Sequence, residues 1–289
     1  MAKVKNKHPA QGNMSVVTLI KDGTKHLLNP RTYQLTNIKT QFKRGKRVTG
    51  MLTTMGRGMG YAYEISNNPF EARRTIKGIQ KFCKHMCNSL ELEVIAVEPI
   101  PQHHALWTSN HISWLDIPTI GSIIPTFFLS KAEISSWPVF GWLARTTNTL
   151  FINRGSGDAD NVSQQMADFL SKGFSVVFFP EATTTDGTAI KRIHGKLLQA
   201  AIDSGVQVQP IVMCYVDENG RLDQAIPYFG DIHFFDSIKR VLDNRPAKAY
   251  VLPLEPIDPA GKTRAELTAI LQQRMIEGLF ELHQRVVTQ

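Results

Sequence analysis

Short apolar runs alternate with longer amphipathic stretches over most of this 289-residue chain. Runs of about four to eight residues rich in β-branched and aromatic side chains predict strands, whereas apolar positions recurring every three or four residues predict helices. Helical patterns separate the predicted strands, so we expect an α/β domain with a largely parallel central sheet, flanked by helices, and a site at the carboxyl ends of the strands. The predicted strands are 91–97, 105–108, 126–129, 149–152, 174–179, 206–213 and 249–254.

Three of these stretches carry more specific signals. The unbroken apolar run 174–179 predicts a strand that is buried on both faces. Pro210 cannot donate a backbone hydrogen bond, so it predicts an edge strand or an irregularity in the run 206–213. Thr263 and Glu266 have the spacing of a capping box, which predicts the start of a final helix. Further helices are predicted at 162–170 and 196–202.

Two amphipathic patterns occupy residues 43–90, between a polar, basic segment 1–42 and the domain 91–289. Basic amphipathic helices in succession are typical of an interfacial membrane anchor. The alternative interpretation is that both apolar faces pack on the protein's own core. The first apolar face consists of Val48, Leu52, Met55, Met59 and Tyr63. The second, after a break at 67–69, consists of Ala72, Ile76, Ile79, Cys83, Met86 and Leu90.

Positive charge is concentrated in the first third of the chain. Residues 1–100 hold 17 Lys and Arg against 6 Asp and Glu, a net charge of +11, whereas residues 101–289 carry −3. Such a surface favours polyanionic partners, either anionic lipid or nucleic acid. Nucleic-acid binding also calls for aromatic side chains among the basic ones, and this segment has few, so we expect a membrane surface and no nucleic acid. A non-catalytic basic protein that binds membrane or nucleic acid is the alternative to an enzyme.

The remaining composition bears on location and metals. No run of about 18 apolar residues is present, so we expect no transmembrane helix. The N-terminus lacks the apolar core of a signal peptide, and we expect a peripheral or monotopic protein at the cytoplasmic face of the cell membrane. Three cysteines argue for a reducing compartment. Cys83, His85 and Cys87 lack a second ligand pair at zinc-site spacing, so we expect no metal site.

The chemistry is expected in the stretch Asn110-His-Ile-Ser-Trp-Leu-Asp116. It follows the predicted strand 105–108, with His111 in a turn and a helix that begins near Ser113. From the first helical turn, the Asp116 carboxylate can reach back to the His111 imidazole. A carboxylate on one ring nitrogen fixes the tautomer and leaves the other nitrogen free as a general base. The alternative is that Ser113 and Asp116 only form a capping box and that His111 is a polar loop residue.

Two further polar clusters follow predicted strands. Phe151-Ile-Asn-Arg154 places a guanidinium after the run 149–152, where it suits bidentate binding of a phosphate. A surface ion pair is the alternative role for this arginine. Phe179-Pro-Glu-Ala-Thr-Thr-Thr185 places a carboxylate and three hydroxyls after the run 174–179. For Glu181 the alternative is that it only caps a turn.

These blocks, in this order and at these separations, resemble the glycerolipid acyltransferase superfamily. The match is greatest with the acylglycerolphosphate (lysophosphatidic acid) acyltransferases and their lysophospholipid and lyso-ornithine-lipid relatives. The first block of the family is Asn-His-x-Ser-x-x-Asp, here 110–116. The third is Phe-Pro-Glu-Gly-Thr-Arg-Ser, here 179–185, and the fourth is a Pro within a strand, here Pro210. The second is a Lys, a Pro, a Gly and then Phe-Ile-x-Arg, here Lys131, Pro138, Gly141 and 151–154.

The resemblance implies an O-acyltransferase of membrane lipid biosynthesis that needs no cofactor. It would move a fatty acyl group from acyl-CoA or acyl carrier protein to the free hydroxyl of a lysolipid. His111 would act as the general base, oriented by Asp116, without an acyl-enzyme intermediate. The positions that the motifs assign to substrate binding are Asn110, Ser113, Lys131, Phe151, Arg154, Glu181, Thr183 and Thr184.

Two positions in the third block differ from the family pattern. The usual Gly is Ala182, and the usual Arg, expected to hold the phosphomonoester of lysophosphatidate, is Thr184. This variant is more similar to the lysophospholipid and ornithine-lipid branch, so we expect an acceptor with a singly charged or zwitterionic head. Candidates to replace the lost charge are Lys191, Arg192 and Lys196.

Overall fold

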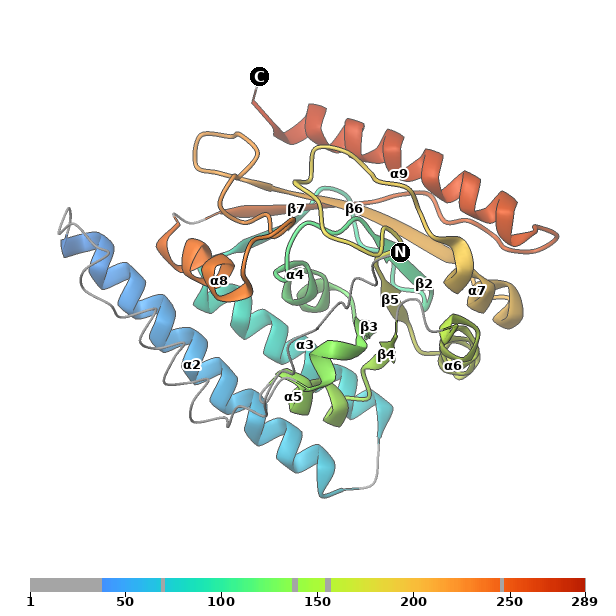
Figure 1. Cartoon of the computed structure of the whole chain (residues 1–289), viewed down its shortest axis with the longest axis horizontal. Coiled ribbons are helices and arrows are strands. Elements are labelled where there is room, and N and C mark those ends of the chain that lie inside the picture. The colour runs from blue at the N-terminus through green and yellow to red at the C-terminus, as the bar shows by residue number, and fades with distance from the viewer. Residues whose placement is uncertain (1–37, 69–70, 137–139, 154–156, 245–246, 289) are drawn as a thin grey trace, which may run out of the picture. The chain divides into compact units, whose positions relative to one another are not determined.

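The computed structural model of the chain describes residues 38–68, 71–136, 140–153, 157–244 and 247–288. Most of the polar segment 1–42 therefore lies outside the described residues, as do Pro138 and Arg154. The α/β prediction is confirmed, because a single sheet with helices packed against it forms the body of the described structure (Figure 1).

Seven strands form the sheet in the order β1-β7-β6-β2-β5-β3-β4. Neighbouring strands are parallel except for β6 and β7, which are antiparallel. The carboxyl ends of β2, β5, β3 and β4 therefore lie along the same side of the sheet, and the motif blocks follow these strand ends. The strands are β1 Glu93–Ala96, β2 Leu106–Ser109, β3 Phe127–Lys131, β4 Leu150–Ile152, β5 Val176–Phe178, β6 Val208–Val216 and β7 Lys248–Pro253.

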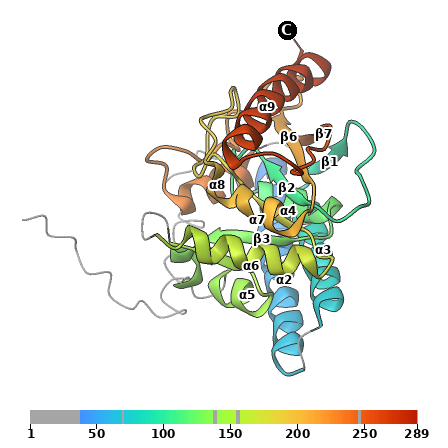
Figure 2. The same cartoon turned by 90° about the vertical axis from the view of Figure 1, so that its right-hand side faces the viewer.

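Helices cover both faces of this sheet (Figure 2). One buried apolar cluster joins a face of the sheet to α6, α7 and α9. On the other face α3 packs on α4 so closely that a Cβ added at Gly121 would lie 2.6 Å from the Cys83 sulfur. The helices are α2 Ile38–Ser66, α3 Ala72–Ser89, α4 Asp116–Ile123, α5 Phe140–Thr146, α6 Ala159–Ser171, α7 Gln199–Ser204, α8 Phe234–Asp243 and α9 Arg264–Val286, with short 3₁₀ helices at Ala132–Ser136 and Gly195–Leu198.

Two local predictions can be compared directly with the structure. The capping box at α9 is confirmed: Thr263 Oγ1 accepts from the Glu266 N–H, and the Glu266 carboxylate accepts from the Thr263 N–H. The edge-strand interpretation of Pro210 is wrong, because β6 lies between β2 and β7. The irregularity is present instead. The Val208 and Pro210 carbonyls accept hydrogen bonds from the Ile257 and Leu254 N–H groups, in the segment after β7. Pro210, which has no N–H to donate, therefore lies opposite this segment and outside the regular β6–β7 ladder.

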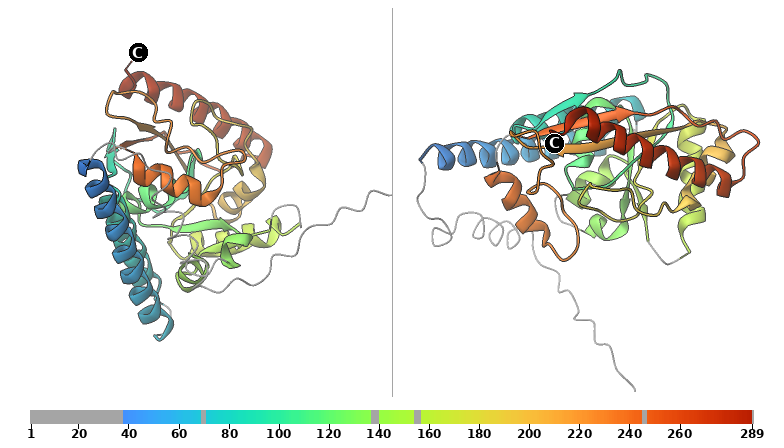
Figure 3. Two further views of the ribbon diagram at one scale, coloured as in Figure 1. Left: turned by 60° about the vertical axis from the view of Figure 1, so that its left-hand side comes forward. Right: turned by 90° about the horizontal axis from the view of Figure 1, so that it is seen from above.

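The predicted N-terminal helix pair is present, but its two apolar faces have different surroundings. The second face is buried as the alternative interpretation expected, since Cys83, Met86 and Leu90 on or next to α3 are at most 5% exposed. The first face is not buried: Leu52, Met59 and Tyr63 of α2 are 53%, 41% and 67% exposed. Helix α2 lies outermost, beside α3, in the views of Figures 1 and 3.

Helix α2 instead contacts the body of the protein through a face of polar and small residues. Arg44 pairs with Asp243 at 3.0 Å, and the buried Arg47 pairs with Glu91 at 3.0 Å. Arg47 also donates to the Asn244 carbonyl, and Thr54 bonds to Ser89. A helix that exposes its apolar stripe in this way has an apolar surface that no described residue covers. Within the described residues, none of the helices has the length and apolar character needed to cross a bilayer.

Candidate active site

The turn after β2 brings His111 and Asp116 together. His111 Nδ1 lies 2.6 Å from Asp116 Oδ2, and the same oxygen accepts from the backbone N–H groups of Ile112 and Ser113 at 2.7 and 3.0 Å. The other oxygen, Oδ1, accepts from the Tyr215 hydroxyl at 2.8 Å. Asp116 is fully buried. Because the carboxylate accepts the Nδ1 proton, the neutral imidazole keeps an unprotonated Nε2 that can accept a proton.

The helix after this turn begins later than the sequence suggested. The prediction of a start near Ser113 with a Ser113–Asp116 capping box is wrong: α4 begins at Asp116, and its N-cap is Leu115 without a side-chain cap. The Asp116 carboxylate reaches back over the turn instead of closing a box. The Ser113 hydroxyl is buried and has no hydrogen-bonding partner among the described residues.

Glu181, after β5, ties this turn to a second loop. Its two carboxylate oxygens accept from the backbone N–H groups of His111 at 2.9 Å and Lys191 at 2.8 Å. Burial raises the pKa of Glu181, while these two N–H groups oppose the shift by stabilising the charged form. The residue is 2% exposed. Its position supports a role in holding the His111 backbone, beyond that of a turn cap.

Aromatic and hydroxyl groups complete the support of the histidine. The Phe179 ring stacks on the His111 ring, with the centroids 3.9 Å apart and the planes 13° from parallel. Thr185 donates its N–H and its hydroxyl to the His111 carbonyl, at 2.8 and 3.3 Å. The imidazole is thus fixed in position by its ring nitrogen, its ring face and its backbone. Such restraint favours catalysis, because no reorganisation is needed when the substrate arrives.

Tyr215 is a site residue that the sequence analysis missed. Its hydroxyl donates to Asp116 and lies 3.3 Å from the Thr119 hydroxyl. Burial, followed by the charge of Asp116, raises the pKa of Tyr215 well above its ordinary value, so the phenol stays protonated and can donate. The available signal was the alternation along β6, which places Ile211, Met213 and Tyr215 on one face.

Asn110 supports the site through the sheet. Its side-chain amide accepts from the Met213 N–H at 2.8 Å and donates to the Met213 carbonyl at 2.9 Å. Asn110 is 1% exposed. Both polar atoms of its amide are therefore used to join the end of β2 to β6, which favours a positioning role over direct contact with a substrate.

The other predicted substrate-binding residues are distributed around the same edge. Lys131 ends β3 and forms an exposed ion pair with Glu133 at 2.9 Å. Phe151 is half-buried in β4, and Arg154, just beyond that strand, lies outside the described residues. Thr183 is exposed and Thr184 is half-buried, two and three residues after Glu181. Thus the structure brings His111, Asp116 and Glu181 together, places Thr183 and Thr184 in the loop that follows Glu181, and does not describe the arginine.

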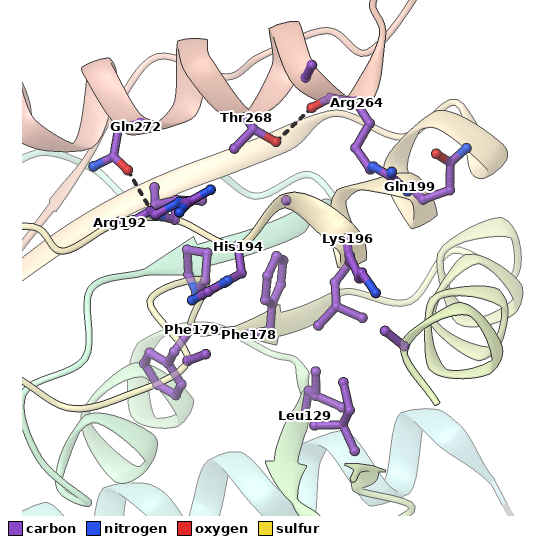
Figure 4. Close-up of a pocket in the computed structure, with 18 of the residues that line it drawn as sticks. Leu129, Phe178, Phe179, Arg192, His194, Lys196, Gln199, Arg264, Thr268 and Gln272 are labelled. Atoms are coloured by element: carbon purple, nitrogen blue, oxygen red, sulfur yellow. Dashed lines mark hydrogen bonds between the residues drawn. The ribbon is translucent and has the colours of Figure 1, made fainter. Parts of the chain in front are cut away.

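A groove of about 1280 Å³ opens beside Phe179 (Figure 4). Its apolar floor includes Leu129, Ile152 and Phe178, at the ends of β3, β4 and β5. The rim carries polar and basic side chains from the segment between β5 and the first residue of α7 and from the first half of α9. These are Arg192, His194, Lys196, Gln199, Arg264 and Gln272. Since Phe179 contacts both His111 and the groove, a ligand in the groove can place its reacting end near the histidine.

The three cysteines are buried and unpaired, two in α3 and one in β6. Burial raises the pKa of Cys83 and raises that of Cys87 to about 12, so neither thiol is a ready nucleophile or metal ligand. Within the part of the chain that the structure describes, no cluster of three or more His, Cys, Asp or Glu side chains is arranged to hold a metal ion.

Comparison with known proteins agrees with this geometry. The sequence model of a family described as Acyltransferase matches residues 91–214. A lyso-ornithine lipid O-acyltransferase of Pseudomonas aeruginosa is 40% identical over 195 residues, which cover 68% of this chain and 75% of that protein. The chain belongs to the acyltransferase family. This assignment confirms the prediction of an enzyme.

One further relative and one solved structure are similar to this acyltransferase. A 1-acyl-sn-glycerol-3-phosphate acyltransferase of Neisseria meningitidis is 34% identical over 178 residues, which cover 56% of this chain and 69% of that protein. The crystal structure of the 1-acyl-sn-glycerophosphate acyltransferase of Thermotoga maritima has a TM-score of 0.63 at 19% identity, covering 87% of this chain and 99% of that one. The latter likeness concerns the fold, which the two proteins share over nearly all of the solved chain.

Backbone conformation at Ala182 gives a prediction about stability. This residue, where the family pattern has Gly, adopts a φ of +55°. Left-handed backbone costs a non-glycine residue about 1–2 kcal/mol, and glycine's greater freedom in the unfolded chain offsets roughly 0.4–1 kcal/mol of the relief. Ala182→Gly should therefore raise the free energy of unfolding by about 0.5–1 kcal/mol in urea denaturation.

The matched control for this substitution is Gly173→Ala. Gly173 has a φ of +80°, and an added Cβ would meet no atom within 4 Å, so only the backbone term changes. We expect Gly173→Ala to lower the free energy of unfolding by about 0.5–1 kcal/mol, the reverse of the effect of Ala182→Gly. If both variants shifted stability in the same direction, the strain assigned to Ala182 would be contradicted.

Proposed function

We propose that this acyltransferase transfers a fatty acyl group from a thioester to the free hydroxyl of a lysolipid, with His111 as the general base. The observation that carries the proposal is the buried Asp116 carboxylate bonded to Nδ1 of His111, whose side chain is 18% exposed. The names of the relatives from Pseudomonas and Neisseria, both of which indicate lysolipid acceptors, support the substrate class.

In the proposed reaction, Nε2 of His111 removes the proton of the acceptor hydroxyl as that oxygen attacks the thioester carbonyl. The new C–O bond forms as the C–S bond breaks, and the imidazolium returns its proton to the departing thiolate. Asp116 orients the ring and stabilises its positive charge while the proton is held. The donor is acyl-CoA or acyl carrier protein, and neither a cofactor nor an acyl-enzyme intermediate is required.

The acceptor that we propose has a singly charged or zwitterionic head, as in lyso-ornithine lipid. Thr184 stands where the family pattern has an arginine, so one fixed positive charge is absent beside the site. A phosphomonoester carries close to two negative charges near pH 7, and a single guanidinium compensates it less completely. Of the candidate substitutes, Arg192 and Lys196 line the groove, whereas Lys191 does not.

An acceptor panel tests this proposal. Purified protein with a labelled acyl thioester should acylate lyso-ornithine lipid or a diester lysophospholipid with a higher kcat/KM than lysophosphatidate. Thr184→Arg should shift the ratio of kcat/KM values about tenfold toward lysophosphatidate, the size of one charge-assisted hydrogen bond. Thr188→Arg, an exposed substitution outside the groove lining, is the matched control. Absence of transfer to every acceptor would exclude the function, and a wild-type preference for lysophosphatidate would exclude the acceptor class.

We also propose that α2 binds the membrane surface through its exposed apolar face. Leu52, Met59 and Tyr63 form this face together with Phe42, which is 76% exposed. Lys43 and Arg57 on the same helix are exposed and would lie at headgroup depth. The cytoplasmic leaflet, rich in anionic lipid, suits this charge. Membrane-bound acceptors make such contact useful, because the acyltransferase must meet them at the bilayer.

Vesicle sedimentation measures the role of this face. Replacing Leu52, Met59 and Tyr63 together by Asn should lower binding to anionic vesicles on the order of 10–100-fold, because each apolar side chain that no longer enters the bilayer forfeits part of about 1.5–3 kcal/mol. Binding of the wild type should fall only in part at high salt, since salt screens the basic residues alone. The matched control replaces Phe229, Ile276 and Phe280, which are also exposed. Equal losses in both variants would contradict the assignment to α2.

A further inference from the structure

Basic side chains lie at two separate places along the groove (Figure 4). Phe179, whose ring stacks on His111, is at one end with Arg192 and His194 nearby. Lys196, Gln199 and Arg264 are at the opposite end of the view. A ligand that fills the groove with its reacting end at His111 therefore extends toward this distant group.

The near end is tightly fixed by the backbone. The Lys191 N–H bonds to Glu181 and the His194 N–H to the Pro180 carbonyl, both at 2.8 Å. The Ile193 N–H donates to the Gln272 side chain of α9 at 2.8 Å. The segment 191–194 is thus clamped between the catalytic loop and α9, which sets the spacing between the two ends of the groove.

The far end combines cations from two elements in close contact. A Cβ added at Gly195 would lie 1.9 Å from Thr268 Oγ1, so the 3₁₀ helix that carries Lys196 packs directly against the first turns of α9, which carry Arg264. Both side chains are exposed in the groove, and neither has an ion pair with a described residue. Of the described residues that line the groove, Asp158 is the one with a carboxylate.

Two like charges held on facing elements repel each other, and a bound anion removes that cost. The position of the pair indicates which anion. In a lysolipid only a few bonds separate the free hydroxyl from the charged head, so the head of a bound acceptor stays near His111. In an acyl thioester of the pantetheine type, the entire pantetheine arm separates the reacting carbonyl from its phosphate.

We propose that Lys196 and Arg264 bind the phosphate of the 4′-phosphopantetheine arm, the chemistry that acyl-CoA and acyl carrier protein share. The arm would lie along the groove, with Gln199 and Gln272 available to its amides and the apolar floor beneath its methylenes. This inference rests on the proposed thioester donor. It assigns the far end of the groove to the donor and leaves the near end, with Arg192, to the acceptor head.

The test compares donors that differ in the phosphate. Lys196→Gln, Arg264→Gln and the double variant are assayed with acyl-CoA, acyl carrier protein thioester, S-acyl-4′-phosphopantetheine and S-acyl-pantetheine. Each single change should raise KM for the three phosphorylated donors about tenfold, the usual worth of one charge-assisted hydrogen bond. The KM for S-acyl-pantetheine and the KM for the acceptor should stay within about twofold. Lys172→Gln, an exposed change outside the groove lining, is the matched control.

Each alternative outcome has a defined meaning. Equal losses with S-acyl-pantetheine, losses confined to acyl-CoA, or a raised KM for the acceptor would overturn the assignment of the pair to this phosphate. The wild-type ratio of kcat/KM for acyl-CoA and acyl carrier protein identifies the source of the arm. Calorimetric titration with 4′-phosphopantetheine and pantetheine makes the same comparison without turnover: selective binding of the phosphorylated form, lost in the double variant, supports the site even if transfer is absent, and equal binding of both forms excludes it.

Discussion

His111→Ala should lower kcat of acyl transfer by about 10²–10⁴-fold, the usual range for loss of a general base. The fold should survive, because the histidine lies at the surface of a turn whose backbone is held independently by Glu181 and Thr185. Its ring contacts Phe179 and Asp116, and both of these residues keep other contacts. Initial rates with saturating acceptor and donor measure the effect, and circular dichroism measures the fold.

The matched control is His104→Ala. His104 is exposed in the loop before β2, so the same side chain is removed without touching the pair. We expect normal transfer and normal vesicle binding in this variant. If the His111 variant retained transfer within a few-fold of the wild type, the general-base assignment would fail.

Asp116→Asn should reduce transfer by up to about 10⁴-fold and also weaken the fold. Four donors converge on the two carboxylate oxygens: the His111 ring, two backbone N–H groups and the Tyr215 hydroxyl. An amide has one acceptor oxygen, so with that oxygen on the three N–H donors its NH₂ group faces the Tyr215 hydroxyl. The hydroxyl must turn to accept, and the loss of its hydrogen bond to a charged group costs about 1–3 kcal/mol of stability. The loss of the carboxylate also removes the control of the histidine tautomer and the charge that stabilises its imidazolium.

Tyr215→Phe separates these two effects. In the Asp116→Asn background the hydroxyl no longer bonds to a charged group, so its removal there should lower the free energy of unfolding by about 1 kcal/mol less than in the wild type. Transfer should stay low, because the negative charge is still missing. Urea denaturation and initial rates on the single and double variants form a complete cycle. Recovery of both quantities would show that Asp116 acts only through packing of the turn.

The sequence predicted those features that depend on short stretches of chain. Buried strands are recognisable because consecutive apolar residues have no polar face, as in β5, and the capping box of α9 involves residues three positions apart. The His111–Asp116 pair was accessible for the same reason, since five positions separate the residues. Predictions failed where distant segments decide the outcome. The start of α4 is set by hydrogen bonds from the turn to Asp116, and the role of Tyr215 depends on a strand almost 100 residues further along.

The apolar face of α2 shows most clearly that a sequence pattern can predict a face without predicting what that face contacts. Its apolar stripe was predicted correctly, and a buried stripe on α3 has the same periodicity. Which stripe is buried depends on the ion pairs of Arg44 and Arg47 with residues from the end of α8 and the start of the sheet domain. Those pairs fix the rotation of α2 about its axis, and propensity and periodicity contain no information about it.

The polar attachment of α2 has a kinetic consequence. The ion pairs of the buried Arg44 and Arg47 side chains and the bond between Thr54 and Ser89 hold the helix in one orientation on the protein, so an enzyme docked through the proposed membrane-binding face would be held in a single pose above the bilayer. Acceptor molecules would then arrive by lateral diffusion within one leaflet. The rate should accordingly follow the mole fraction of acceptor in the vesicle and change little when the same vesicles are diluted in buffer at constant bound enzyme.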